Sequence, residues 1–231
     1  MLITFSRKIT VVYIIFLKIA YILLFSLKIF YVLLKLIFIY NIILKKRKNM
    51  TEEGTLHITL PFTKDIIKTL KAGDNITISG TIYTARDAAH KRMSDALNSG
   101  ETLPFDIENQ TIYYAGPCPA KDGDIIGSCG PTTSCRMDKY TPQLLELGLI
   151  AMIGKGDRDE SVKKSIVKHG AVYLAAIGGA GALYSECVES VEVIAYPDLG
   201  PESIKKLIVK NMPVTVVIDS HGNNLYENKQ L

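Results

Sequence analysis

From residue 50 onward the sequence alternates between strand-like and helix-like segments, and this alternation restricts the fold more than any other feature. Alternating apolar and polar residues predict strands, whereas capping residues followed by helical composition predict helices. We predict strands at 55–60, 76–82, 111–115, 149–153, 171–177, 191–195 and 214–218. We predict helices at 63–70, 85–97, 142–147, 159–169 and 202–210, the fourth of them ending at Gly170. This alternation in one compact chain is typical of an α/β domain with a mixed sheet.

Residues 1–49 differ sharply in composition from the rest. They contain nine Lys and Arg, no Asp or Glu, and long runs of Ile, Leu, Phe and Tyr. Lys18, Lys28 and Lys35 interrupt the runs, so no stretch reaches the roughly 18 uncharged residues of a membrane-spanning helix. The segment is too long for a secretory signal and lacks the Ser and Arg content of a mitochondrial presequence. We interpret it as translated upstream sequence, with a membrane anchor as the alternative. We expect a cytoplasmic domain that spans residues 50–231.

Charge and cysteine content exclude two classes of function. Nine of the 27 Lys and Arg lie in 1–49, which leaves 18 against all 23 Asp and Glu, a formal charge of −5 for residues 50–231. A nucleic-acid-binding domain needs clustered basic residues, so nucleic acid is not an expected partner. Cys118, Cys129, Cys135 and Cys187 show no C-x-x-C pair and no histidine at zinc-finger spacing. We therefore expect reduced thiols and no metal site built from this chain alone.

Four glycine-containing segments follow predicted strands, at 80–90, 130–137, 154–157 and 221–224. In open α/β sheets ligands bind where the strands end. The first three segments supply Arg86, Arg136 and Lys155, at helix starts or tight turns where backbone N–H groups also attract anions. An arginine holds a carboxylate by two parallel hydrogen bonds, and a lysine acts as a point charge. The three cations predict a site for a dicarboxylic acid.

Each of these residues also has a structural interpretation. An arginine followed by an aspartate at a helix start, such as Arg86 and Asp87, is commonly an exposed pair. Thr132 and Thr133 are equally expected as helix caps, since a hydroxyl without a basic neighbour is a poor proton acceptor. His90 lies four residues after Arg86 and so shares its helix face, which makes it the one histidine considered for the site.

Taken together, these segments resemble the β subunit, or C-terminal domain, of class I fumarate hydratases and the related L-tartrate dehydratases. The resemblance covers residues 55–225. Its motifs are 84–90 (Thr-Ala-Arg-Asp-Ala-Ala-His), 115–117 (Ala-Gly-Pro), 130–133 (Gly-Pro-Thr-Thr) with Arg136 and Met137, 154–156 (Gly-Lys-Gly) and 221–225 (His-Gly-Asn-Asn-Leu). Five such blocks in the same order are very unlikely to agree by chance.

The resemblance implies a swivelling β/β/α domain that closes over an active site in a separate α subunit. There, three cysteines of the α subunit hold a 4Fe–4S cluster, and the αβ unit is expected to dimerise further. By resemblance, Arg86, Arg136 and Lys155 hold the substrate carboxylates. Thr132 moves a proton together with an aspartate of the α subunit. Around these residues Asp87, His90 and Thr133 are supporting candidates, and this chain supplies no metal ligand.

The implied reaction is the reversible hydration of fumarate to (S)-malate. Ala85, Ala88 and Ala89 favour the fumarate branch, because the tartrate branch tends to have cysteine in that block. Two alternatives remain at this stage, an L-tartrate dehydratase β subunit and a non-catalytic carboxylate-binding domain without an α partner. The choice among these three functions and the subunit stoichiometry stay open at the level of sequence.

Overall fold

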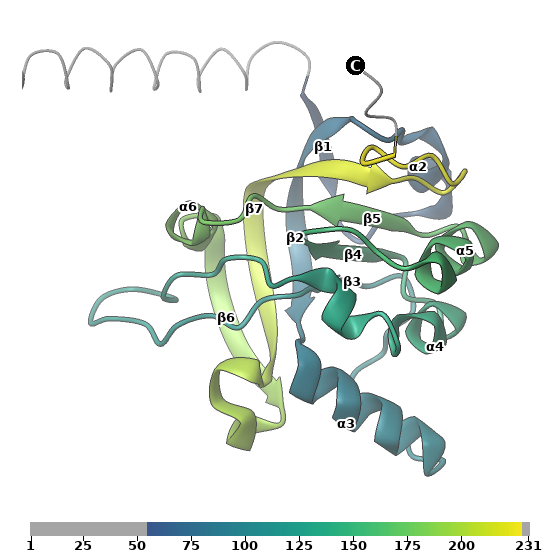
Figure 1. The fold of residues 1–231 in the computed structure, drawn as a ribbon. Coiled ribbons are helices and arrows are strands. Elements are labelled where there is room, and N and C mark those ends of the chain that lie inside the picture. The colour runs from purple at the N-terminus through teal and green to yellow at the C-terminus, as the bar shows by residue number, and fades with distance from the viewer. Residues whose placement is uncertain (1–54, 228–231) are drawn as a thin grey trace, which may run out of the picture. The chain divides into compact units, whose positions relative to one another are not determined.

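The computed structural model describes residues 55–227, so the interpretation of 1–49 lies outside the described residues (Figure 1). Strands and helices alternate through most of this range. In chain order the elements are β1 (Leu56–Thr59), α2 (Lys64–Thr69), β2 (Asn75–Thr84), α3 (Asp87–Asn98), β3 (Thr111–Tyr113), η1 (Ser134–Met137), α4 (Thr141–Glu146), β4 (Ala151–Gly154), α5 (Glu160–His169), β5 (Val172–Ala175), α6 (Gly181–Ser185), β6 (Val188–Ala195), η2 (Pro197–Glu202) and β7 (Ile204–Ile218). Within residues 55–227, no helix has the length and apolar character needed to cross a bilayer.

One seven-stranded mixed sheet carries the fold, in the order β1-β2-β3-β4-β5-β7-β6. Strands β1 to β5 pair in parallel with their neighbours. β7 runs antiparallel to β5 and β6. β7 also pairs with most of β2, so β2, β3, β4, β5 and β7 close into a five-stranded barrel. The predicted α/β fold with a mixed sheet is confirmed.

The two faces of the barrel strands pack into separate apolar cores, because successive side chains of a strand point to opposite sides. Tyr113 in β3 and Ile153 in β4 belong to one core, together with residues of all the other strands of the barrel. Their neighbours Ile112 and Met152 belong to the second core, which includes buried residues of α3, α4 and α5. In Figure 1 these three helices lie on the same side of the sheet.

Helix ends follow the local signals in the sequence. The hydroxyl of Thr63 accepts a hydrogen bond from the Ile66 N–H at 3.3 Å at the start of α2. Asp159 does the same for Val162 at 2.9 Å at the start of α5. Gly170 ends α5 in the left-handed conformation, with φ 63° and ψ 45°, which glycine adopts at low cost. The predicted end of this helix at Gly170 is therefore confirmed.

The predicted helix at 202–210 is wrong, because residues 204–210 form the first half of β7 and Glu202 ends the short segment η2. The composition of 202–210 suits a helix, but Ile204, Leu207 and Val209 are buried in a strand that is hydrogen-bonded to β2 on one side and β6 on the other. These ladders outweigh local propensity. The register places Lys205 opposite Thr84, at the end of β2. The residues just before β7 therefore lie at the edge where β2 ends.

Candidate carboxylate-binding site

The predicted cations gather at the edge formed by the carboxyl ends of β2, β3 and β4. Thr84 pairs with Tyr113, and Tyr113 pairs with Ile153, so these three strands end side by side. Arg86 follows β2 by two residues, and Lys155 directly follows β4. Parallel strands thus bring together segments that are nearly 70 positions apart in the sequence. The edge predicted for ligand binding is the one that carries these side chains.

Arg86 occupies the N-cap position of α3, with an extended backbone. Its Nη2 lies 3.3 Å from Glu202 Oε1 and 3.6 Å from Asp87 Oδ2, and the side chain is 21% exposed. The Arg86–Asp87 pair considered above does form, but it is part-buried and Arg86 shares it with Glu202. A Cβ on Gly116, in the turn after β3, would lie 2.9 Å from Arg86 Nη1, so this position accepts only glycine while the guanidinium stays in place.

Arg136 lies on η1 and reaches the start of α3. Its Nε donates to Asp87 Oδ1 at 2.8 Å, and the side chain is 49% exposed. Asp87 therefore contacts both arginines, one through each oxygen. The two terminal nitrogens of Arg136 make no hydrogen bond within residues 55–227, which leaves the outer edge of the guanidinium available for a carboxylate.

Thr132 and Lys155 are held side by side by backbone hydrogen bonds. The Lys155 N–H donates to the Thr132 carbonyl at 3.3 Å, and the Ser134 N–H donates to the Lys155 carbonyl at 2.9 Å. The Thr132 N–H in turn donates to the Tyr114 carbonyl at 2.6 Å, which ties this loop to the end of β3. The structure thus brings Thr132, Arg86, Arg136 and Lys155 to a single edge of the barrel.

The capping roles considered for the two threonines are wrong. Thr133 stands at the N-cap position of η1, but its side chain makes no capping hydrogen bond. The Thr132 hydroxyl forms no hydrogen bond to any residue between 55 and 227. The helix start is therefore made without either hydroxyl, and the Thr132 side chain stays available for a ligand.

His90 supports Arg86 from inside the domain. The ring is buried, and its Nδ1 lies 2.9 Å from the Arg86 carbonyl oxygen. Burial lowers the pKa of His90 to about 4, so the ring is neutral near pH 7 and Nδ1 carries the proton that it donates to this carbonyl. His90 fixes the backbone of the helix start, and its burial removes it from contact with a ligand.

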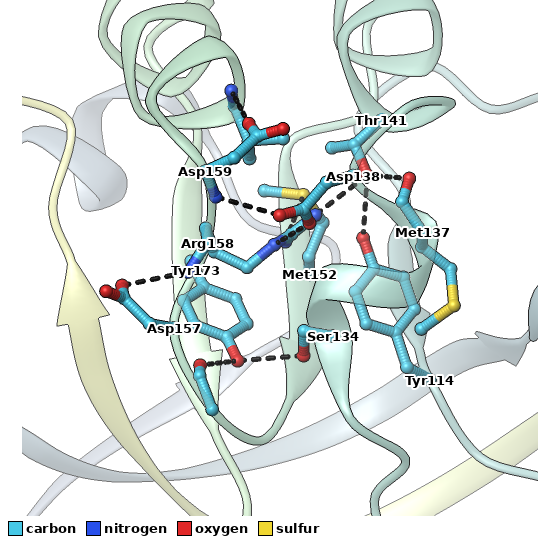
Figure 2. Close-up of polar contacts among 12 residues, drawn as sticks. Tyr114, Ser134, Met137, Asp138, Thr141, Met152, Asp157, Arg158, Asp159 and Tyr173 are labelled. Carbon is cyan, nitrogen blue, oxygen red and sulfur yellow. Dashed lines mark hydrogen bonds and ion pairs between the residues drawn. The ribbon is translucent and has the colours of Figure 1, made fainter.

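A buried hydrogen-bond network fixes the two loops that carry Arg136 and Lys155 (Figure 2). The Tyr173 hydroxyl donates to the Gly156 carbonyl at 2.8 Å and accepts a hydrogen bond of 2.8 Å from Ser134 Oγ. A Cβ on Gly154 would lie 2.0 Å from Ser134 Oγ, so this approach requires glycine at the end of β4. Ser134 begins η1 and Gly156 follows Lys155, so β5 joins both loops through one tyrosine.

The same region contains a buried ion pair between Arg158 and Asp138 (Figure 2). Arg158 Nε donates to Asp138 Oδ1 at 2.6 Å, and Nη2 donates to Thr141 Oγ1 at 2.8 Å. The second oxygen of Asp138 accepts from the Asp159 N–H at 2.8 Å. Asp138 follows η1 directly, and Arg158 precedes α5. The pair therefore fixes η1 against the loop that follows β4.

A family model described as "Fumarase C-terminus" matches residues 39–229. The chain belongs to the fumarase C-terminus family.

Individual relatives agree with this family. The chain is 43% identical over 171 residues to a Methanocaldococcus jannaschii protein named "Putative L(+)-tartrate dehydratase subunit beta", which covers 71% of this chain and 88% of the relative. It is 39% identical over 158 residues to the aerobic class I fumarate hydratase of Escherichia coli K12, covering 68% of this chain and 29% of that enzyme. A Geobacillus stearothermophilus relative named "Putative fumarate hydratase class I" is 38% identical over 182 residues, 77% of this chain and 34% of the relative. The chain thus spans about a third of these fumarate hydratases.

Two features of this fumarase C-terminus domain were not predicted. Glu202, which contacts Arg86, was assigned to the start of a helix that does not form. The 221–224 segment was grouped with the cation-bearing turns, but it follows β7, which is antiparallel to β2 and ends beside the start of β2. There Asp219 accepts hydrogen bonds from the N–H groups of Ala72, His221 and Asn223. This segment is a structural turn at the edge opposite the cations.

The described cysteines do not form a site for an iron–sulfur cluster. No group of three or more His, Cys, Asp or Glu within residues 55–227 is arranged to hold a metal ion. Cys118 and Cys135 are exposed and Cys129 is buried. Burial raises the pKa of Cys129 to about 12, so its thiol stays protonated near pH 7 in this domain. The residues of this domain do not fit such a group.

Proposed function

We propose that this chain is the β subunit of an iron–sulfur hydro-lyase that reversibly hydrates fumarate to (S)-malate, with a 4Fe–4S cluster on a separate α subunit. The observation that carries the proposal is the convergence of Arg86, Arg136 and Lys155 on one sheet edge, with Thr132 beside Lys155. Membership of the fumarase C-terminus family supports the reaction class. The M. jannaschii relative is named as a β subunit and matches this chain over most of its length, which supports a separate α partner.

In this proposal the cations bind and orient the substrate. The terminal nitrogens of Arg136 receive one carboxylate as a two-point contact. Arg86 lies beside Arg136, because Asp87 contacts both arginines, and adds a second positive charge to the site. Lys155 extends along Gly178, where a Cβ would lie 3.7 Å from Nζ. Among the described residues Lys155 has no acidic partner, so its charge is available to an anion.

In this proposal Thr132 Oγ1 transfers the reacting proton together with an aspartate of the α subunit. When this proton leaves the substrate carbon or is delivered to it, negative charge builds on the adjacent carboxylate, and the fixed cations stabilise that charge. The domain would swivel to close this edge over the α subunit, which excludes water from the site, and the αβ unit would dimerise further. The expected compartment is the cytoplasm.

A β subunit of L-tartrate dehydratase is the second candidate, favoured by the extent of the match to the relative with that name. Ala85 and Ala89, which favour fumarate at the level of sequence, are both fully buried and do not face a ligand. Assay of the reconstituted complex with both substrates distinguishes these two candidates. A carboxylate-binding domain without a catalytic partner is the third candidate.

The test is reconstitution with an α subunit that contains three cluster-binding cysteines, under anaerobic conditions. The chain alone is expected to bind no iron and to hydrate no fumarate, whereas the complex is expected to interconvert fumarate and malate. A complex that dehydrates tartrate but leaves fumarate unchanged identifies the second candidate. Iron-dependent turnover by the isolated chain, or a complex inactive on both substrates, contradicts the proposal.

A further inference from the structure

Glu202 joins the turn before β7 to Arg86 and to the start of α3. It ends η2, the short segment between β6 and β7, and its side chain points across to the start of α3. Oε1 lies 3.3 Å from Arg86 Nη2, and Oε2 accepts a hydrogen bond of 3.2 Å from the Ala88 N–H. A single carboxylate thus contacts both Arg86 and the first turn of α3.

The backbone around Glu202 is firmly anchored. The Ser203 N–H and hydroxyl both donate to the Gly200 carbonyl, at 3.1 and 2.7 Å. Lys205 Nζ donates to the carbonyls of Gly200 and Pro201 and to Ser203 Oγ. The Lys205 N–H also donates to Thr84 Oγ1 at 3.2 Å, which joins this turn to the end of β2. Glu202 is therefore presented from a fixed turn.

The two arginines of the site have different closest carboxylates. Asp87 is 2.8 Å from Arg136 but 3.6 Å from Arg86, so it is the main partner of Arg136. Arg86 has Glu202 as its closest acidic partner, and its Nε is buried with no acceptor among the described residues. A guanidinium with so few hydrogen bonds of its own depends mainly on the ion pair with Glu202 for its orientation, with the longer contact to Asp87 as the second.

We propose that Glu202 is a positioning residue, which holds the Arg86 guanidinium in the orientation that receives a substrate carboxylate. The inference rests on the proposed function, because it assumes that Arg86 binds a dicarboxylate. Glu202 acts through Arg86 and does not itself contact the substrate. Its role follows from the antiparallel course of β7, which brings the turn before that strand to the end of β2.

A structural role for Glu202 makes a different prediction, and the chain offers a matched control. Asp198 lies on the same segment, η2, and forms an ion pair with Arg92 on the same helix, α3. This pair also joins η2 to α3, but it does not involve Arg86. If Glu202 only joined these two elements, Asp198→Asn would act as Glu202→Gln does. The glutamine oxygen can still accept from the Ala88 N–H, so Glu202→Gln keeps the helix contact and removes the charge that holds Arg86.

The experiment uses the reconstituted αβ complex with wild-type, Glu202→Gln and Asp198→Asn β chains. Fumarate hydration gives kcat and KM, calorimetric titration with succinate gives binding without turnover, and thermal melting reports stability. For Glu202→Gln we expect kcat/KM to fall roughly tenfold to a hundredfold, mainly through KM, with a parallel weakening of succinate binding. Asp198→Asn should retain wild-type values, and the two variants should melt alike.

Two results overturn the inference. The first is a Glu202→Gln complex with wild-type KM and wild-type succinate affinity. The second is an Asp198→Asn complex with the same loss as Glu202→Gln, which reduces Glu202 to a structural contact. Failure of the proposed function appears separately, in the wild-type complex, as absence of both fumarate turnover and succinate binding, and it removes the premise of the inference as well.

Discussion

Replacing Arg158 by methionine is expected to destabilise the domain strongly, because it breaks the buried ion pair with Asp138. The side chains of Arg158 and Asp138 are 0% and 6% exposed. Without Arg158, Asp138 keeps a hydrogen bond from the Asp159 N–H but loses its counter-charge inside the protein. Removing one partner of a buried pair typically costs about 3–5 kcal/mol. For a domain of this size that corresponds to a melting temperature lower by about 6–20 °C.

The same substitution at Arg92 is the control, since Arg92 pairs with Asp198 at the surface, where its side chain is 42% exposed. Exposed ion pairs contribute little to stability, so Arg92→Met should melt close to the wild type. The double variant Asp138→Leu/Arg158→Met, which removes both charges of the pair, should recover part of the loss. Thermal melting followed by circular dichroism, with urea unfolding for the free energy, gives the comparison. Equal losses for Arg158→Met and Arg92→Met would refute the reasoning.

Three further predictions follow from the site. Thr132→Val should lower kcat of the complex strongly while KM and the melting temperature stay nearly unchanged, because this hydroxyl makes no hydrogen bond within residues 55–227. Steady-state kinetics and thermal melting of this one variant measure all three quantities, and preserved turnover would remove Thr132 from the reaction. Gly116→Ala should raise KM of the complex, because the new Cβ would lie 2.9 Å from Arg86 Nη1 and displace the guanidinium. An unchanged KM would show that Arg86 does not hold the substrate. Lowering the pH should destabilise the domain through His90, whose pKa falls from 6.5 to about 4 on burial. The unfolded chain then binds more protons than the folded one between these values, so stability is complete above pH 6.5 and falls by about 3 kcal/mol as the pH approaches 4. Urea unfolding of the wild type and of His90→Phe at several pH values measures this, and the variant should lose that part of the dependence.

The candidate site was largely predictable because its cations lie in local patterns. Arg86 and Lys155 each follow a strand at a turn or helix start, and Arg136 lies in a short helical turn after a glycine-containing loop. Such positions are determined by capping residues, glycines and periodicity within about ten residues. The parallel order of β2, β3 and β4 then brings the strand ends together without any further information. The contact of Asp87 with Arg136 and the hydrogen bond of His90 to the Arg86 carbonyl were not visible in the sequence, although both residues had been considered.

The sequence by itself therefore determined the α/β class, most of the strand and helix positions, and the identity of the three cations, because each depends on neighbouring residues. Only the tertiary structure decided the course of β7, since a Lys-containing segment becomes a strand where β2 and β6 offer hydrogen bonds on both sides. That course brings Glu202 to Arg86 and takes the 221–224 turn to the opposite edge. The tertiary structure also made Arg158 a buried partner of Asp138 and not a surface residue, because the two positions, 20 residues apart, meet only when η1 packs against the loop after β4.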